Sequence, residues 1–220
     1  VGYILRDCDV RVLVTSRGRL QTLATELADC PALQHIVLVD EATDSIPAMP
    51  QSMRPWAGLL SQPASALHRA IDTDMVSIFY TSGSTGKPKG VVLSHRNMVT
   101  GAHSVASYLG NTQQDRLLAV LPFSFDYGFS QLSTAFSVGA TVVLLEYLLP
   151  RDVLRALARE KITGLAGVPP LWIQLADIPW PEGVDAHLRY MTNSGGAMPR
   201  ATLGKLRANA PRTQFFLMYG

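Results

Sequence analysis

Residues 80–90 of this 220-residue chain read YTSGSTGKPKG, a short stretch in which glycines, hydroxyl side chains and lysines alternate. An apolar run, residues 75–80, leads into it, and the apolar triplet 91–93 follows it. Glycines let a backbone fold tightly enough to bring its N–H groups close to an anion. Hydroxyl groups donate further hydrogen bonds, and lysines supply positive charge. The stretch is therefore predicted to be a loop between two strands that holds a polyphosphate.

Three common motifs do not describe this loop. A Walker A loop needs Gly, four residues and then Gly-Lys-Ser/Thr, but Gly86–Pro88 reads Gly-Lys-Pro, and Thr81 stands where the first glycine would be. The dinucleotide-binding pattern G-x-G-x-x-G is absent, and neither Ser82 nor Ser84 lies in the nucleophile pattern G-x-S-x-G. A flexible surface turn is the remaining alternative, and the density of anion-binding groups between two apolar runs argues against it.

The loop and its continuation, GVVLSHRN at residues 90–97, resemble the phosphate-binding signature of the adenylate-forming superfamily. Its members include AMP-forming acyl-CoA synthetases, luciferases and the adenylation domains of nonribosomal peptide synthetases. The resemblance implies ATP- and Mg²⁺-dependent activation of a small carboxylic acid as an acyl-adenylate. The acyl group then passes to a thiol, either of CoA or of phosphopantetheine on a carrier protein. An amino-acid adenylation domain and a non-catalytic nucleotide-binding protein remain as alternatives.

The resemblance also assigns residues to the nucleotide. The phosphate contacts are expected from Thr81, Ser82, Gly83, Ser84, Thr85, Gly86, Lys87 and Lys89. The adenine is expected to lie along Gly195, Gly196 and Ala197 and to stack on Tyr219. Two alternatives remain for the adenine contacts: a simple helix-entry turn ahead of Pro199, and a strand-end core aromatic at Tyr219.

The pair Phe125-Asp126 is the ambiguous part of the substrate site. In amino-acid-activating members of the family, a Phe-Asp pair supplies a carboxylate for the substrate ammonium, whereas many acyl- and aryl-CoA synthetases carry a histidine near Phe125. The alternative is that Asp126 caps a helix running through Phe129 and Leu132. The expected substrate pocket consists of Phe125, Asp126, Tyr127, Gly128 and Ser194.

The pattern along the chain predicts an α/β fold, with a mostly parallel sheet and helices on both faces, as part of the large N-terminal domain of an adenylate-forming enzyme. Helices are predicted over residues 20–27, from Ser94 through Leu109, from Pro150 and from Pro199. Strands are predicted over residues 10–15, 35–39, 76–80, 91–93, 117–121, 140–145, 162–168, 189–192 and 213–218.

Residues 41–73 carry four prolines without a sustained period and are predicted to be a surface connection with at most one short helix. We therefore expect a partial N-terminal lobe with this connection over residues 1–72, and an ATP-binding core over residues 73–220. In doubly wound sheets, ligands bind beyond the carboxyl ends of strands. The segments expected to meet there are residues 80–90, 121–128, 192–199 and 218–220.

Composition argues against several other classes of protein. The chain is 47% apolar and 16% charged, has a formal net charge of +2, and contains no block of like charges, which argues against a nucleic-acid partner. No stretch has the length and apolarity of an integral membrane segment. Cys8 and Cys30 fit ordinary thiols of a cytoplasmic protein and form no metal-ligand pattern. Both ends of the chain look cut. The resemblance implies that the family's catalytic lysine and ribose-binding aspartate would follow Gly220. No catalytic set is therefore complete, and the chain alone is expected to be inactive.

Overall fold

The computed structural model describes residues 1–40, 49–82 and 86–219. The chain divides into two compact units, Val1–Arg69 and Ala70–Gly220. The first unit contains a three-stranded parallel sheet in the order β1-β2-β3. Its strands are β1 (Val12–Thr15), β2 (His35–Leu38) and β3 (Ser52–Pro55), and its helices are α1 (Gly2–Asp7), α2 (Arg17–Ala28) and α3 (Trp56–Leu60).

The first unit contains two elements that were not predicted. Besides the one short helix that was allowed for, here α3, residues 41–73 contain the strand β3; residues 41–48 lie outside the described part. The sequence signal for β3 is weak because Ser52–Pro55 is a short edge strand that ends at a proline, which only an edge position tolerates. Helix α1, ahead of β1, was not predicted either.

The second unit is built on a five-stranded parallel sheet in the order β10-β9-β8-β6-β7. From β6 the chain runs outward to β7, returns to β8 on the other side of β6, and continues outward through β9 and β10. The direction of winding therefore reverses between β6 and β8, and the carboxyl edge at such a reversal is where ligands bind in open α/β sheets. The strands are β6 (Arg116–Ala119), β7 (Thr141–Leu144), β8 (Gly164–Gly167), β9 (Tyr190–Asn193) and β10 (Gln214–Leu217).

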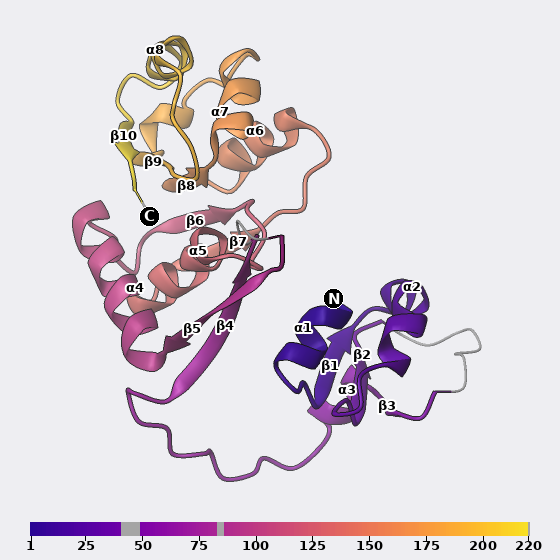
Figure 1. Ribbon diagram of the computed structural model, residues 1–220. Helices are drawn as coiled ribbons and strands as arrows, with labels where there is room; N and C mark the ends of the chain where they lie inside the picture. Colours follow the sequence, from indigo (N-terminus) through magenta and orange to yellow (C-terminus); the bar gives the residue numbers. More distant parts are fainter. Residues whose placement is uncertain (41–48, 83–85, 220) are drawn as a thin grey trace. The chain divides into compact units, whose positions relative to one another are not determined.

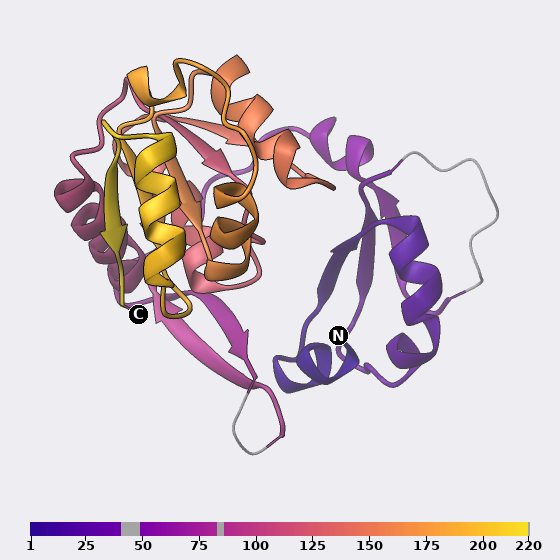
Figure 2. The ribbon, with the colours of Figure 1, turned by 90° about the horizontal axis from the view of Figure 1, so that it is seen from above.

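Helices cover both faces of this sheet (Figure 1), which confirms the predicted fold class. Successive strand residues point to opposite faces. Leu117 packs with Leu109 and Ala135 on one face, whereas Leu118 packs into the larger core on the other. Figure 2 shows α7 and α8 in front of the strands on that second face. The helices are α4 (His95–Leu109), α5 (Asp126–Ser137), α6 (Pro150–Arg159), α7 (Pro169–Ala176) and α8 (Arg200–Asn209).

The predicted strand–loop–strand around the phosphate motif is confirmed as an antiparallel hairpin. Its strands are β4 (Met75–Thr81) and β5 (Lys89–Ser94), with Thr81 opposite Lys89. Ser94 begins α4 as predicted: its Oγ accepts from the Asn97 N–H at 3.2 Å, and the Asn97 Oδ1 accepts from the Ser94 N–H at 2.9 Å. The hairpin contacts α5 through the rings of Phe79 and Phe129, whose centroids are 5.6 Å apart.

Candidate nucleotide and substrate site

A cavity of about 220 Å³ lies in the second unit beside the carboxyl ends of β9 and β10. It brings together three of the four segments expected to meet, namely the start of α5, the residue after β9 and the residues after β10. The hairpin that carries the fourth segment contributes two strand residues. The lining residues are Phe79, Leu93, Met98, Gly101, Ala102, Val105, Asp126, Tyr127, Ser130, Ser133, Ser194, Met218 and Tyr219.

Helix α4, predicted from Ser94 through Leu109, supplies one wall of the cavity. Ala102 is buried, and Met98 and Val105 face the cavity together with Gly101. Periodicity identifies which face of a helix is covered, but it does not distinguish a wall packed against the core from a wall that lines a cavity. The participation of α4 in the site was therefore missed.

Of the five residues expected in the substrate pocket, the structure places Asp126, Tyr127 and Ser194 on the cavity wall. Phe125 packs against the hydrophobic core instead. Gly128 lies against the loop that precedes α5, where a Cβ atom would overlap the Pro122 carbonyl oxygen. Neither Phe125 nor Gly128 is among the residues that line this cavity.

The alternative role of Asp126 as a helix cap is wrong. The N-cap residue of α5 is Phe125, and Asp126 is the first helical residue, with no side-chain cap among the described contacts at this helix end. At that position a negative charge is favoured by the positive end of the helix dipole. The Asp126 carboxylate thus borders the cavity, and the described part of the chain provides it with no ion-pair partner.

Tyr127 joins α5 to the sheet. Its hydroxyl lies 2.6 Å from the Thr192 Oγ1 of β9, and burial raises the pKa of the Tyr127 phenol, so the side chain is neutral at physiological pH. The same ring borders a second, smaller cavity of about 30 Å³ between α4, α5 and the sheet. Val105, Tyr127, Ser130 and Met218 line both cavities, so the two are neighbours.

Two buried side-chain amides hold the loops at the carboxyl edge, and sequence reasoning missed both. Gln131 of α5 bonds to the backbone of the loop after β6, and the Asn193 Nδ2 donates to the Gly196 carbonyl at 2.9 Å in the loop after β9. In the sequence, the available signal is a polar residue within an otherwise inward-facing pattern. That signal does not say which backbone groups the amide would meet.

The expected adenine segment follows β9 in an open turn. Gly195 has φ +76°, a left-handed conformation that favours glycine. Helix α8 then begins at Arg200, with Pro199 as its N-cap residue. Tyr219 is exposed and lines the cavity. An exposed ring and a glycine turn can together accommodate a flat base.

The phosphate loop is described at Thr81, Ser82, Gly86, Lys87 and Lys89, whereas Gly83, Ser84 and Thr85 lie outside the described residues. Gly86 has φ +86°, again the left-handed region. Both lysines are exposed, and neither forms an ion pair in the described part of the chain. Hydroxyls, backbone N–H groups and two unpaired ammonium groups are a donor set that suits a polyphosphate.

Two features of the described residues bear on metals and membranes. Residues 1–40, 49–82 and 86–219 contain no cluster of three or more His, Cys, Asp or Glu side chains that could hold a metal ion. Within the same ranges, none of the helices combines the length and apolarity needed to cross a bilayer.

The sheet reversal, the glycine-rich hairpin and the cavity at the carboxyl edge belong to an α/β fold. The family model described as AMP-binding enzyme matches residues 1–220, and the chain belongs to that family. It is similar to the long-chain-fatty-acid–CoA ligase of Thermus thermophilus, with 29% identity over 93% of this chain and 37% of the relative. It is also similar to the delta-poly-L-ornithine synthetase of Acinetobacter baumannii, with 31% identity over 90% of this chain and 15% of the relative.

Among solved structures, the anthranilate CoA ligase AuaEII in complex with anthranoyl-AMP matches with a TM-score of 0.83 and 25% identity. The match covers 97% of this chain and 41% of that structure. The chain thus spans less than half the length of each of these three proteins.

Proposed function

We propose that this protein activates a small carboxylic acid with ATP as an acyl-adenylate and then passes the acyl group to a thiol. The observation that supports the proposal is that the hairpin carrying the phosphate motif also contributes a residue to the candidate acid pocket. The hairpin β4–β5 ends in the motif, and its residue Phe79 lines the same cavity as Asp126, Ser194 and Tyr219.

In the first half-reaction, a carboxylate oxygen of the acid attacks the α-phosphorus of ATP, and pyrophosphate leaves. Negative charge develops on the departing pyrophosphate, and neutralising it is the main task of the protein in phosphoryl chemistry. The loop hydroxyls of Thr81 and Ser82, the backbone N–H groups, and the ammonium groups of Lys87 and Lys89 serve this purpose. Mg²⁺, when bound with ATP, adds positive charge between the phosphate oxygens; we assign it no protein ligand among the described residues.

The adenine lies along Gly195–Ala197 and against the ring of Tyr219. The exposure of Tyr219 supports this assignment, because a ring that packs in no core is available for stacking. In the second half-reaction, the sulfur of CoA or of a carrier-bound phosphopantetheine attacks the acyl carbon, and AMP leaves. Cys8 and Cys30 form no disulfide with each other, which suits the reducing conditions of the cytoplasm, where we place the protein.

We further propose that the preferred acid carries an amino group. Asp126 borders the cavity without an ion-pair partner in the described residues. A substrate ammonium would give that carboxylate a charge-assisted hydrogen bond, whereas a plain fatty acid would bury it unpaired. The ligand named for AuaEII, anthranoyl-AMP, is an amino-bearing acyl-adenylate. The competing candidate is a fatty acyl-CoA synthetase, favoured by the apolar side chains of α4 in the same wall.

The test is acid-dependent exchange of labelled pyrophosphate into ATP by the complete protein. The panel contains a medium-chain fatty acid, benzoate, anthranilate and several amino acids. We expect exchange with at least one acid and the fastest exchange with an amino-bearing one. If no acid supports exchange although ATP binds, the non-catalytic nucleotide-binding alternative replaces the enzyme.

A further inference from the structure

Gln131 is a buried polar side chain that no step of the proposed reaction uses. It lies in the second turn of α5, and its side chain is 6% exposed. A neutral amide at such a depth is costly unless its donors and acceptor are all paired. Its hydrogen-bond partners therefore show what the residue holds in place.

All the partners belong to the segment between the end of β6 and the first turn of α5. The Gln131 Oε1 accepts from the Val120 N–H at 3.2 Å and, more weakly, from the Leu121 N–H at 3.5 Å. The Nε2 donates to the Leu121 carbonyl at 3.2 Å and to the Gly128 carbonyl at 2.7 Å. One side chain thus ties the loop that leaves the sheet to the helix that the loop enters.

A different side of the same helix faces the candidate substrate. Asp126, Ser130 and Ser133 recur at i, i+4 and i+7 and line the larger cavity. Gly128 faces the loop, and Gln131 bonds to the loop and borders only the smaller cavity between α4, α5 and the sheet. Because α5 lacks a side-chain cap at its described N-terminal end, the Gln131 bonds and the close contact at Gly128 fix where α5 begins. A displacement of this helix start would move Asp126 and Tyr127 together.

We propose that Gln131 is a positioning residue for the acid-binding wall of the site. It acts through the loop after β6 and through the start of α5, and it sets the location of the Asp126 carboxylate without touching the substrate. This inference rests on the proposed acid activation. It predicts that a substitution of Gln131 lowers kcat/KM for the acid and leaves the KM for ATP nearly unchanged.

Two substitutions separate the parts of this role. Gln131→Met keeps the length of the side chain and removes every hydrogen bond. Gln131→Glu keeps the shape, but an ionised carboxylate cannot donate to the Leu121 and Gly128 carbonyls. A protonated Glu can donate once and accept once, and burial favours that form, so the Gln131→Glu variant should recover as the pH falls. The matched controls are Gln174→Met and Gln174→Glu, at an exposed glutamine of α7.

The experiment measures pyrophosphate exchange by the complete protein against acid and ATP concentration, between about pH 5.5 and about pH 8. A shift of the catalytic groups by roughly 1 Å costs about a hundredfold in rate. We therefore expect kcat/KM for the acid to fall about a hundredfold in Gln131→Met at every pH, and in Gln131→Glu near pH 8 only. The KM for ATP should stay within about twofold. The other titratable groups around the two cavities are Asp126, Tyr127, Tyr190 and Tyr219. They are the same in the wild type, whose profile is therefore the reference at each pH.

The inference is overturned if both Gln131 variants keep wild-type kcat/KM for the acid, or if KM for ATP and for the acid rise together. A second measurement, hydrogen exchange at the Val120 and Leu121 amides, needs no turnover. We expect faster exchange in Gln131→Met, and in Gln131→Glu an acceleration that shrinks toward low pH after correction for intrinsic rates. Unchanged protection at both amides also overturns the inference. Absence of pyrophosphate exchange in the wild type would instead refute the proposed function, and the amide data would still decide whether Gln131 holds this loop.

Discussion

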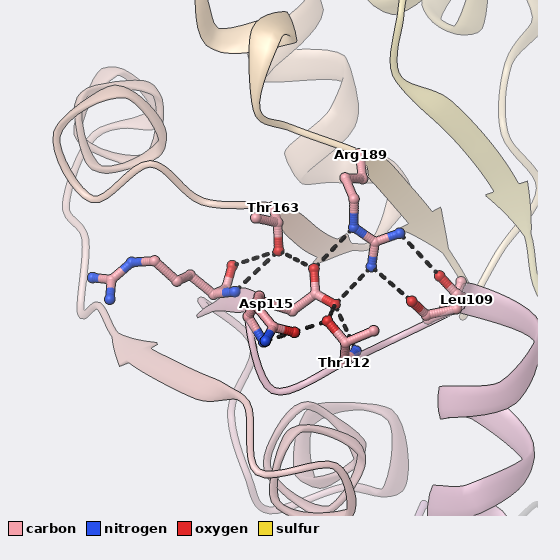
Figure 3. Close-up of polar contacts among 8 residues, drawn as sticks. Leu109, Thr112, Asp115, Thr163 and Arg189 are labelled. Atoms are coloured by element: carbon pink, nitrogen blue, oxygen red, sulfur yellow. Dashed lines mark hydrogen bonds and ion pairs between the residues drawn. The ribbon is translucent and has the colours of Figure 1, made fainter.

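Asp115 and Arg189 form a bidentate ion pair at the amino-terminal edge of the five-stranded sheet (Figure 3). The Arg189 Nε lies 2.9 Å from Asp115 Oδ1, and one terminal guanidinium nitrogen lies 2.8 Å from Oδ2. Asp115 also accepts from the Thr163 hydroxyl at 2.6 Å and from the Thr112 N–H at 2.8 Å. The Asp115 side chain is 3% exposed, so its carboxylate is paired with these protein groups and not with water.

The pair joins elements that are far apart in the sequence. Asp115, Thr163 and Arg189 immediately precede β6, β8 and β9, and Arg189 also donates to the carbonyls of Leu109 and Gly110 at the end of α4. The network thus fixes the edge of the sheet opposite the candidate site, together with the helix that forms one wall of the cavity.

We predict that Asp115→Asn lowers the free energy of unfolding by roughly 3 kcal/mol. Breaking one side of a buried pair costs about 3–5 kcal/mol, and the lower end applies because Arg189 is 42% exposed. Urea unfolding measures the change. The control is Asp177→Asn, whose partner Lys205 is exposed and whose pair should contribute about 0–1 kcal/mol. Equal losses of unfolding free energy in the two variants would show that the Asp115–Arg189 pair is no stronger than an exposed ion pair.

The same carboxylate predicts a pH dependence of stability. Burial raises the pKa of Asp115, but hydrogen bonds from Thr163, Thr112 and Arg189 outweigh burial and hold that pKa below its usual value. The stabilisation is therefore present above the unfolded-state pKa, about 3.9, and is lost as the pH falls through the lower folded-state pKa. Below about pH 4 the wild type should lose stability faster than Asp115→Asn. Parallel curves of the two proteins would show that Asp115 does not contribute.

Gly128→Ala should destabilise the fold by about 3 kcal/mol, because the new Cβ would overlap the Pro122 carbonyl oxygen and push the loop from α5. The matched control is Gly204→Ala in α8, where a Cβ meets nothing within 4 Å. That change should stabilise the protein by about 0.5–1 kcal/mol through helix propensity. Thermal unfolding of the two variants gives opposite shifts if the close contact is correctly described.

The double substitution Lys87→Met and Lys89→Met should raise the KM for ATP in exchange by about a hundredfold or more, since each of the two charge-assisted contacts contributes about 1.5–3 kcal/mol. The control is Lys205→Met on α8, which should leave the KM for ATP unchanged. Because the lysines are exposed, the difference between wild type and double variant should shrink as salt is added. A double variant with wild-type kinetics would remove these lysines from the phosphate site.

Asp126→Asn tests the preference for an amino group with a matched pair of acids, anthranilate and benzoate. If the carboxylate binds a substrate ammonium or amine, the ratio of kcat/KM for the two acids should fall at least about tenfold in the variant. Equal losses with both acids would mean that Asp126 serves the fold or the general reaction. No preference in the wild type would favour a plain acyl substrate.

Sequence patterns predicted most of the second unit because its strands are apolar runs and its helices carry clear starts, such as Ser94. The hairpin around the phosphate loop followed from two apolar runs that flank the glycines. Helix α7 was missed because Pro169-Pro170 was interpreted as the end of a strand, although proline also suits the first turn of a helix.

Tertiary contacts account for the parts of the site that the sequence did not predict. Gln131 and Asn193 are polar residues whose hydrogen-bond partners are backbone atoms. No local sequence pattern encodes those partners. Phe125, expected in the pocket, packs in the core because the chain turns at Gly128 against Pro122, and that contact too is invisible in the sequence.

The most direct test of acyl-adenylate formation follows an oxygen atom. The complete protein is given ATP, a thiol acceptor and an active acid labelled with ¹⁸O in its carboxylate, and the products are analysed by mass spectrometry. Attack of the carboxylate on the α-phosphorus, followed by transfer of the acyl group to the thiol, leaves one labelled oxygen in AMP. We predict AMP carrying one ¹⁸O and unlabelled pyrophosphate. Unlabelled AMP, or ADP with the label in inorganic phosphate, would contradict the proposed mechanism.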